Sequence, residues 1–160
     1  MRQPNDAVRE HLARLLDWED AHVGLETSVG GIPPAFRGTQ APGFEHSAWQ
    51  LLEHLRIAQD DLLAFCLDEK YVHELKWPDD YWPATPAPPD EAAWDASLAA
   101  CQKSRQRLQQ VAREVEDLTA SVPTGDANQT YLRSILVAAD HVAYHVGQIV
   151  AVRRALGVWR

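Results

Sequence analysis

The sequence predicts an all-α protein, a four-helix bundle that forms a single domain over residues 1–160. Apolar residues recur at spacings of three and four in four long segments, and none of these segments shows the strict alternation of a strand. A long proline-rich stretch separates the second segment from the third. Four amphipathic helices bury their apolar stripes most simply against one another, as a bundle.

The first helix is expected between Asn5 and about Val29, where the apolar stripe has helical spacing. The glycines and prolines of residues 30–34 end it. The second helix is expected to open at Ser47, because Ser47 and Gln50 form an S-x-x-Q capping box, and to end near Leu67.

Residues 68–89 contain five prolines, which exclude a long helix and favour an extended path. About 22 extended residues reach roughly 70 Å, more than the length of a 20-residue helix. We therefore predict a crossover connection, after which the third helix runs parallel to the second. Within it, the segment 77–83 is expected to be a lid over a pocket, part of a dimer surface, or a loop pinned to the bundle by its tryptophans.

Asp90 is a good N-cap for the third helix, whose apolar stripe continues to Leu118 before Pro123 and Gly125 close it. The fourth helix is expected from about Asn128 to Leu156. Gly157 then follows as the residue after the C-cap, and the basic residues of the last turn suit the negative end of the helix dipole.

The charge of the chain argues against several classes of function. A formal charge of −8 and a pI near 5.3 oppose binding to nucleic acid or to anionic lipid. From the sequence we expect neither a membrane span nor a signal peptide, and therefore a cytoplasmic protein. Cys66 and Cys101 would then remain thiols, and both are expected to pack in the core.

Three histidines carry the chemical hypothesis. His141 and His145 are four residues apart on the fourth helix, so both side chains project from one face, about 6 Å apart, and can bind one ion. His54, close to the buried stripe of the second helix, could supply a third ligand from across the bundle. Three neutral imidazoles suit zinc, nickel, copper or iron, and an open fourth position is typical of a catalytic site.

Each candidate also has a plainer interpretation. An isolated H-x-x-x-H pair on a helix is usually two unrelated histidines. Gln148 shares the face of His145 and could orient a ligand, or simply bond to the backbone. His22 is our candidate for a base in the pocket, because antiparallel packing of the first two helices would bring it level with His54. His46 lies about 12 Å before His54 along a helix, too far to share an ion.

The chain resembles the DinB-like superfamily of four-helix metal proteins, which includes bacillithiol and mycothiol S-transferases and thiol-dependent maleylpyruvate isomerases. The likeness spans nearly the whole chain and is strongest over residues 46–56 and 140–148. It implies a metal triad of His54, His141 and His145, a bundle with one parallel pair of helices, and a homodimer.

The leading hypothesis from the residues and the resemblance is a transferase that uses a divalent metal, zinc or nickel first, to join a low-molecular-weight thiol to an electrophilic small molecule. A metal-dependent small-molecule hydrolase is the nearest variant. Two further hypotheses remain. One is a non-catalytic module that binds a metal or a ligand, and the other is a metal-free bundle that serves as an interaction module.

Overall fold

The computed structural model describes residues 4–159, and these residues form helices and no strand. The all-α prediction is therefore confirmed. One isolated antiparallel bridge, between Ser121 and Thr130, lies in the turn before the last helix. The helices are α1 (Pro4–Leu15), α2 (Leu25–Val29), α3 (Pro34–Arg37), α4 (Ala48–Leu67), the 3-10 turn η1 (Asp79–Tyr81), α5 (Glu91–Glu114) and α6 (Tyr131–Ala155).

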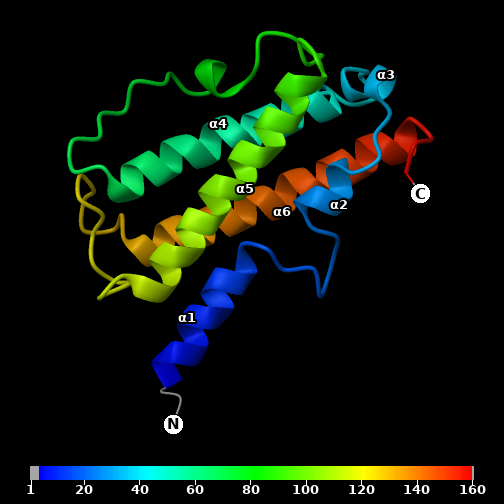
Figure 1. Cartoon of the computed structure of the whole chain (residues 1–160). Helices are drawn as coiled ribbons and strands as arrows, with labels where there is room; N and C mark the ends of the chain where they lie inside the picture. Colours follow the sequence, from blue (N-terminus) through cyan, green and yellow to red (C-terminus); the bar gives the residue numbers. More distant parts are fainter. Residues whose placement is uncertain (1–3, 160) are drawn as a thin grey trace.

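The long helices pack as a bundle in which α4 lies against both α5 and α6 (Figure 1). The helix α5 follows the direction of α4, whereas α6 runs against it. The chain between α4 and α5 passes along the outside of the bundle and returns to the end at which α4 began. The predicted crossover between the second and third long helices is thus present.

The predicted capping box of α4 forms as expected. The Gln50 backbone N–H donates to Ser47 Oγ at 3.2 Å, and the Ser47 N–H donates to Gln50 Oε1 at 3.0 Å. The Ser47 hydroxyl also donates to the carbonyl of Pro86, near the end of the crossover. One residue therefore starts α4 and fixes the returning chain beside it.

The end of α6 confirms the role predicted for Gly157. Its φ of 71° is the left-handed conformation that glycine adopts without strain. The N–H of Val158 bonds to the carbonyl of Arg153 at 2.9 Å, and the N–H of Gly157 bonds to the carbonyl of Arg154 at 3.1 Å. This pair of bonds is a Schellman motif, which satisfies carbonyls that a helix end leaves free.

The prediction of one continuous first helix is wrong, because the helix stops at Leu15 and resumes as α2 at Leu25. The Glu19 carboxylate explains the break: it accepts hydrogen bonds from the Gly24 N–H at 2.9 Å and from the Thr27 hydroxyl at 3.4 Å. A side chain from the linker thus caps α2, and a helical path through residues 16–24 would lose that cap.

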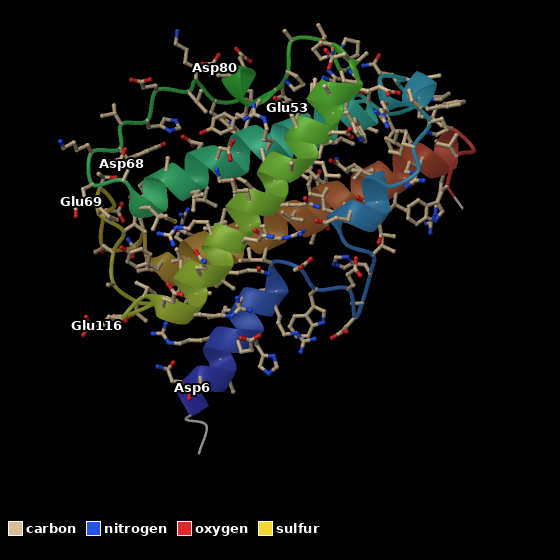
Figure 2. The ribbon with its side chains drawn as sticks, viewed as in Figure 1. Asp6, Glu53, Asp68, Glu69, Asp80 and Glu116 are labelled. Atoms are coloured by element: carbon tan, nitrogen blue, oxygen red, sulfur yellow. The ribbon has the colours of Figure 1, made fainter. Side chains whose placement is uncertain are left out.

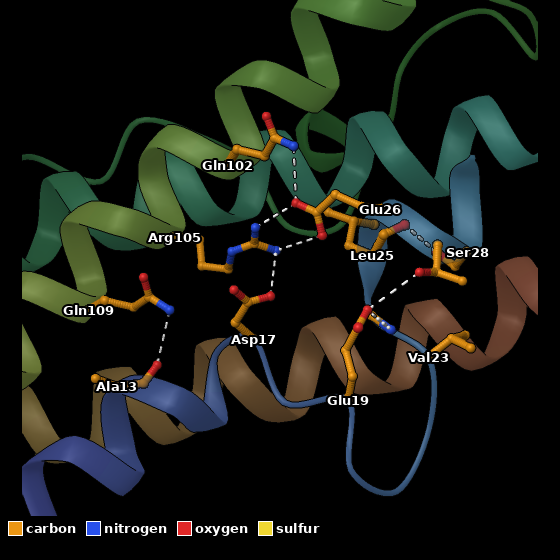
Figure 3. A network of polar contacts seen from close by, with 12 residues as sticks. Ala13, Asp17, Glu19, Val23, Leu25, Glu26, Ser28, Gln102, Arg105 and Gln109 are labelled. Carbon is orange, nitrogen blue, oxygen red and sulfur yellow. Dashed lines mark hydrogen bonds and ion pairs between the residues drawn. The ribbon is translucent and has the colours of Figure 1, made fainter. Parts of the chain in front are cut away.

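Ion pairs hold the two ends of this linker against α5 (Figure 3). The guanidinium of Arg105, a buried residue, bonds to Glu26 on α2 at 3.1 Å and lies 3.4 Å from the Asp17 carboxylate. Two acidic groups around one buried arginine compensate its desolvation. Residues 16–24 are therefore irregular but anchored.

Two further helix boundaries differ from the prediction. The helix α5 ends at Glu114, although Leu118 beyond it is still buried in the core, so the apolar stripe outlasts the helix. The helix α6 starts at Tyr131 rather than near Asn128, because Thr130 is the N-cap and accepts from the Arg133 N–H at 3.2 Å.

The core consists of two clusters along the bundle. One joins α2, the first half of α4 and the second half of α6, and the other joins α1, the second half of α5 and the first half of α6. Cys66 and Cys101 are both buried free thiols, as expected, and burial raises the pKa of Cys101 to about 12.

One helix of the described residues, α6, is long and apolar enough to cross a membrane by length and composition. One such helix is weak evidence for a membrane span. A mean hydropathy of 1.4 over 18 residues, with 44% of the window buried inside the protein, also fits a core helix. The cytoplasmic location stays a prediction.

We expect Ser47→Ala to lower the free energy of unfolding by about 2 kcal/mol, because it removes an N-cap bond and the bond to Pro86 together. Urea denaturation measures the change. The exposed Ser121 is the matched control, and Ser121→Ala should stay within about 0.5 kcal/mol of wild type. Equal effects of the two substitutions would contradict the dual role of Ser47.

Candidate metal centre

The structure brings His54, His141 and His145 together inside the bundle. His141 Nε2 lies 3.0 Å from His54 Nε2 and 3.0 Å from His145 Nε2. All three donor atoms lie within 4.8 Å of one another. The three side chains therefore form a group that could hold one metal ion.

Helix geometry explains the convergence. His141 and His145 are one turn apart on α6, and their rings meet edge to face at 4.5 Å between centroids. His54 lies in the second turn of α4, which runs antiparallel to α6, and its ring centroid is 4.9 Å from that of His141 and 4.7 Å from that of His145. Two helices thus supply one donor set.

Hydrogen bonds on the outer ring nitrogens orient two of the imidazoles. His54 Nδ1 lies 2.7 Å from the carbonyl oxygen of Tyr81, and His145 Nδ1 lies 2.6 Å from Gln148 Oε1. A carbonyl oxygen only accepts, so we assign the proton of each ring to Nδ1. The unprotonated Nε2 atoms then face the centre with their lone pairs, as metal-binding histidines do.

The donor spacing fits a metal ion. Zinc–nitrogen bonds of about 2.0–2.1 Å in a tetrahedral site separate neighbouring nitrogens by roughly 3.3 Å. The two Nε2–Nε2 separations of 3.0 Å, from His141 to His54 and from His141 to His145, are close to that value. With the proton of His141 on Nδ1, the lone pairs of all three Nε2 atoms would face one cation.

Burial keeps the three imidazoles neutral. It lowers the pKa of His141 to about 4 and that of His145 to about 3, and the neighbouring histidines add to both shifts. Burial lowers the pKa of His54 as well. All three rings are therefore in the metal-binding form at pH 7.

The crossover provides one wall of the site. The Trp82 ring lies between two histidine rings, 4.0 Å from that of His54 and 3.8 Å from that of His46, and stacks on both. His46 and His54 are thereby separated by an indole, in agreement with the expectation that they do not share an ion.

A cavity of about 420 Å³ opens beside the triad. It touches the centre through His145. Its lining includes both apolar and hydrogen-bonding groups, among them Phe44, His46, Leu51, Trp82, Tyr144 and Gln148. A small molecule in this cavity would contact a triad histidine directly.

His22 does not line this cavity. It lies in the linker before α2, is exposed, and lines two other cavities together with Ala143 and Val146 of α6. The break after Leu15 explains the displacement, because the level predicted for His22 assumed one continuous helix. The imidazole outside the triad that does line the cavity is that of His46.

Two residues missed by the sequence analysis fix the crossover to the bundle. The Tyr81 hydroxyl donates to Asp61 at 2.5 Å, and the Tyr71 hydroxyl donates to the same carboxylate at 2.8 Å. Burial, aided by the Asp61 charge, raises the pKa of both tyrosines. This part of segment 77–83 is thus pinned to the bundle, while Trp77 is 72% exposed.

The position of Asp61, which accepts both of these hydrogen bonds, is related by its spacing in the sequence to that of His54. Asp61 follows His54 by seven residues, so both lie on the same face of α4. The carbonyl of Tyr81 and the ring of Trp82 carried no comparable signal, because a backbone oxygen has no sequence signature and the segment contains two Trp-Pro pairs.

The chain is thus a helical bundle in which three histidines from two antiparallel helices converge on a site that could hold a metal ion. The sequence model of the DinB superfamily, a metal-binding family, matches residues 8–149, and the chain belongs to that superfamily. No curated protein and no solved structure matched the chain.

We expect single substitutions of His54, His141 and His145 by Ala each to reduce the bound metal from about one ion per chain to below about 0.2, because two imidazoles bind far more weakly than three. Elemental analysis after purification without a nickel column measures the content. His11→Ala and His22→Ala are the matched controls and should keep the metal. Full metal content in all three triad variants would contradict the site.

The metal-free protein should lose stability as the pH falls. The unfolded chain protonates these histidines near pH 6.5, whereas the folded chain resists protonation until about pH 4 at His141 and about pH 3 at His145. The free energy of unfolding should therefore be level above pH 7 and decline between pH 6.5 and 4.

Urea denaturation in the presence of a chelator tests this decline. His145→Gln should flatten the slope below pH 6 by up to about 1.4 kcal/mol per pH unit, the contribution of one proton. A slope that is the same in His145→Gln and wild type would show that His145 is not held neutral.

Proposed function

We propose that the protein is a metal-dependent transferase that joins a low-molecular-weight thiol to an electrophilic small molecule. The observation that supports it best is the position of the triad, whose His145 forms part of the wall of an accessible cavity. A divalent ion held by three neutral imidazoles, zinc or nickel by ligand type, would lower the pKa of an arriving thiol.

The residues of the chain would perform the remaining tasks. Trp82 and Phe44 offer apolar surface to the electrophile, and the volume of about 420 Å³ lies within the range of small-molecule sites. His46 lies on the wall and is our candidate to accept the thiol proton, in place of His22.

Gln148 has a positioning role in this proposal. Its Oε1 accepts from His145 Nδ1 at 2.6 Å, and its Nε2 donates to the Tyr144 hydroxyl at 3.3 Å. Because the Tyr144 oxygen accepts that bond, its own proton is free to donate to a substrate in the cavity. One amide thus orients a triad ring and a hydrogen-bond donor.

We expect turnover with one of four thiols, glutathione, bacillithiol, mycothiol or coenzyme A, when each is paired with electrophilic acceptors. Chelation should abolish it, and His141→Ala should lower kcat/KM by about 100-fold or more, because that variant loses an ion ligand. Loss of free thiol and mass spectrometry of the adduct are the measurements. His22→Ala, which lies outside the cavity, should keep full activity.

The outcomes separate the transferase from its alternatives. Metal-dependent product formation without a thiol would identify a hydrolase instead. A metal-loaded protein that converts no pair of substrates would count against transfer and favour a non-catalytic metal-binding module.

A further inference from the structure

Two neighbouring cavities lie along α6, on a side of the helix that carries none of the triad histidines. One, of about 530 Å³, lies along residues 136–146, and the other, of about 510 Å³, lies along residues 143–154. The two cavities share four lining residues, two from the linker before α2 and two from α6: Ala21, His22, Ala143 and Val146. We call the two cavities together the α6 groove.

The sequence of α6 gives the α6 groove an apolar floor. Two rows of lining residues, each at four-residue spacing, form this floor, one of small residues and one of valines: Ala139, Ala143 and Gly147, and Val142, Val146 and Val150. A Cβ built on Gly147 meets no atom within 4 Å, so the space above the small row is open. Between Asp140 and Arg153 the helix carries no acidic residue, lysine or arginine.

The linker before α2 forms the opposite wall. Leu16 lines the first cavity and Val23 lines the second. The ion pairs of Arg105 with Asp17 and with Glu26 tie this linker and α2 to α5 (Figure 3). The linker is therefore anchored to α5 rather than to α6, and the α6 groove lies between the linker and α6.

The end of the α6 groove near the C-terminus is positively charged. Arg154 and Trp159 line the second cavity, and the guanidinium groups of Arg153 and Arg154 lie 4.7 Å and 6.0 Å from the centre of the Trp159 ring. Among the described residues, Arg153 bonds to backbone carbonyls, and neither arginine has a carboxylate partner. The acidic side chains labelled in Figure 2 lie on α1, on α4, on the crossover and after α5, and none lies on α6. This end is thus locally positive, although the chain carries −8 overall.

The other end of the α6 groove is acidic. Asp17 and Asp140 line the first cavity, and Asp140 has no ion-pair partner among the described residues. Asp140 and Arg154 are fourteen residues apart, about 21 Å along the helix. An anionic group is therefore attracted to one end and repelled from the other, with an apolar floor between them.

We propose that the α6 groove binds an unbranched alkyl chain that ends in a carboxylate, with the carboxylate at Arg154 and the chain beneath the linker. Two cavities in line, joined at shared residues, fit an elongated and flexible ligand better than a compact one. The apolar floor stabilises the chain by burial, and a guanidinium can bind both oxygens of a carboxylate. The volume of each cavity lies within the range of small-molecule sites. This inference does not depend on the metal or on the reaction proposed above.

Calorimetric titration with dodecanoate, below the concentration at which it forms micelles, tests the ligand chemistry. We expect saturable binding that is about tenfold weaker for octanoate, because the shorter chain buries fewer methylenes. Dodecanol and dodecylamine should each bind at least about fivefold more weakly than dodecanoate, since neither carries a negative charge. Arg154→Gln should weaken the binding of dodecanoate by about fivefold and remove its advantage over dodecanol. Arg133→Gln, an exposed arginine of α6 outside both cavities, is the matched control and should bind as wild type does.

Two phenylalanine substitutions test the position of the chain. Ala143→Phe fills the junction of the two cavities and should weaken the binding of dodecanoate by about tenfold. Val137→Phe, at an exposed position of α6 outside both cavities, should have no effect. Both variants should keep the helical circular dichroism of wild type, because both positions are exposed.

The affinity for dodecanoate should be the same with and without a chelator. Loss of binding on chelation would place the carboxylate at the metal centre and overturn the inference. The absence of saturable binding would also overturn it, as would equal affinity for dodecanol and dodecanoate. An affinity that Arg154→Gln and Ala143→Phe leave unchanged would show that the ligand binds elsewhere.

Discussion

The candidate metal centre depends on keeping three buried imidazoles neutral while their Nε2 nitrogens face one another. His141 Nε2 lies 3.0 Å from the Nε2 atoms of both His54 and His145, and burial removes the water that would otherwise solvate these three nitrogens. Two of the outer N–H groups must also find acceptors inside the protein. The Tyr81 carbonyl and the Gln148 side chain provide them, one from the crossover and one from α6 itself.

The long crossover therefore has two roles: it allows α5 to run parallel to α4, and it orients the ring of His54. The Tyr81 carbonyl reaches His54 because the Tyr81 hydroxyl is bound to Asp61, two turns further along α4 than His54. The same helix therefore holds the ligand and the anchor of the segment that orients it. Trp82 then stacks on the outer face of His54 and excludes water from that side. A change at Asp61 would thus affect the ring of His54 without touching it.

The sequence predicts the helices and the triad because both follow from local periodicity. The four-residue spacing of His141 and His145 and the place of His54 beside an apolar stripe are properties of single helices. The wall of the cavity, by contrast, comes from contacts between residues distant in sequence, such as Trp82 with His46. The break in the first helix was missed for a related reason, since the Glu19 side chain caps α2 by a bond that helical spacing does not encode.

The helix α6 has a buried side and an outward side, and its composition reflects both. His145 and Ile149 are buried toward α4, whereas Asp140 and Gly147 face outward, so few positions are left for solvating charges. This is why α6 alone among the described helices reaches the hydropathy of a membrane span. Tyr144 is 63% exposed and also lines the cavity beside the triad, so a single residue of α6 belongs both to the outer surface and to the wall of that cavity.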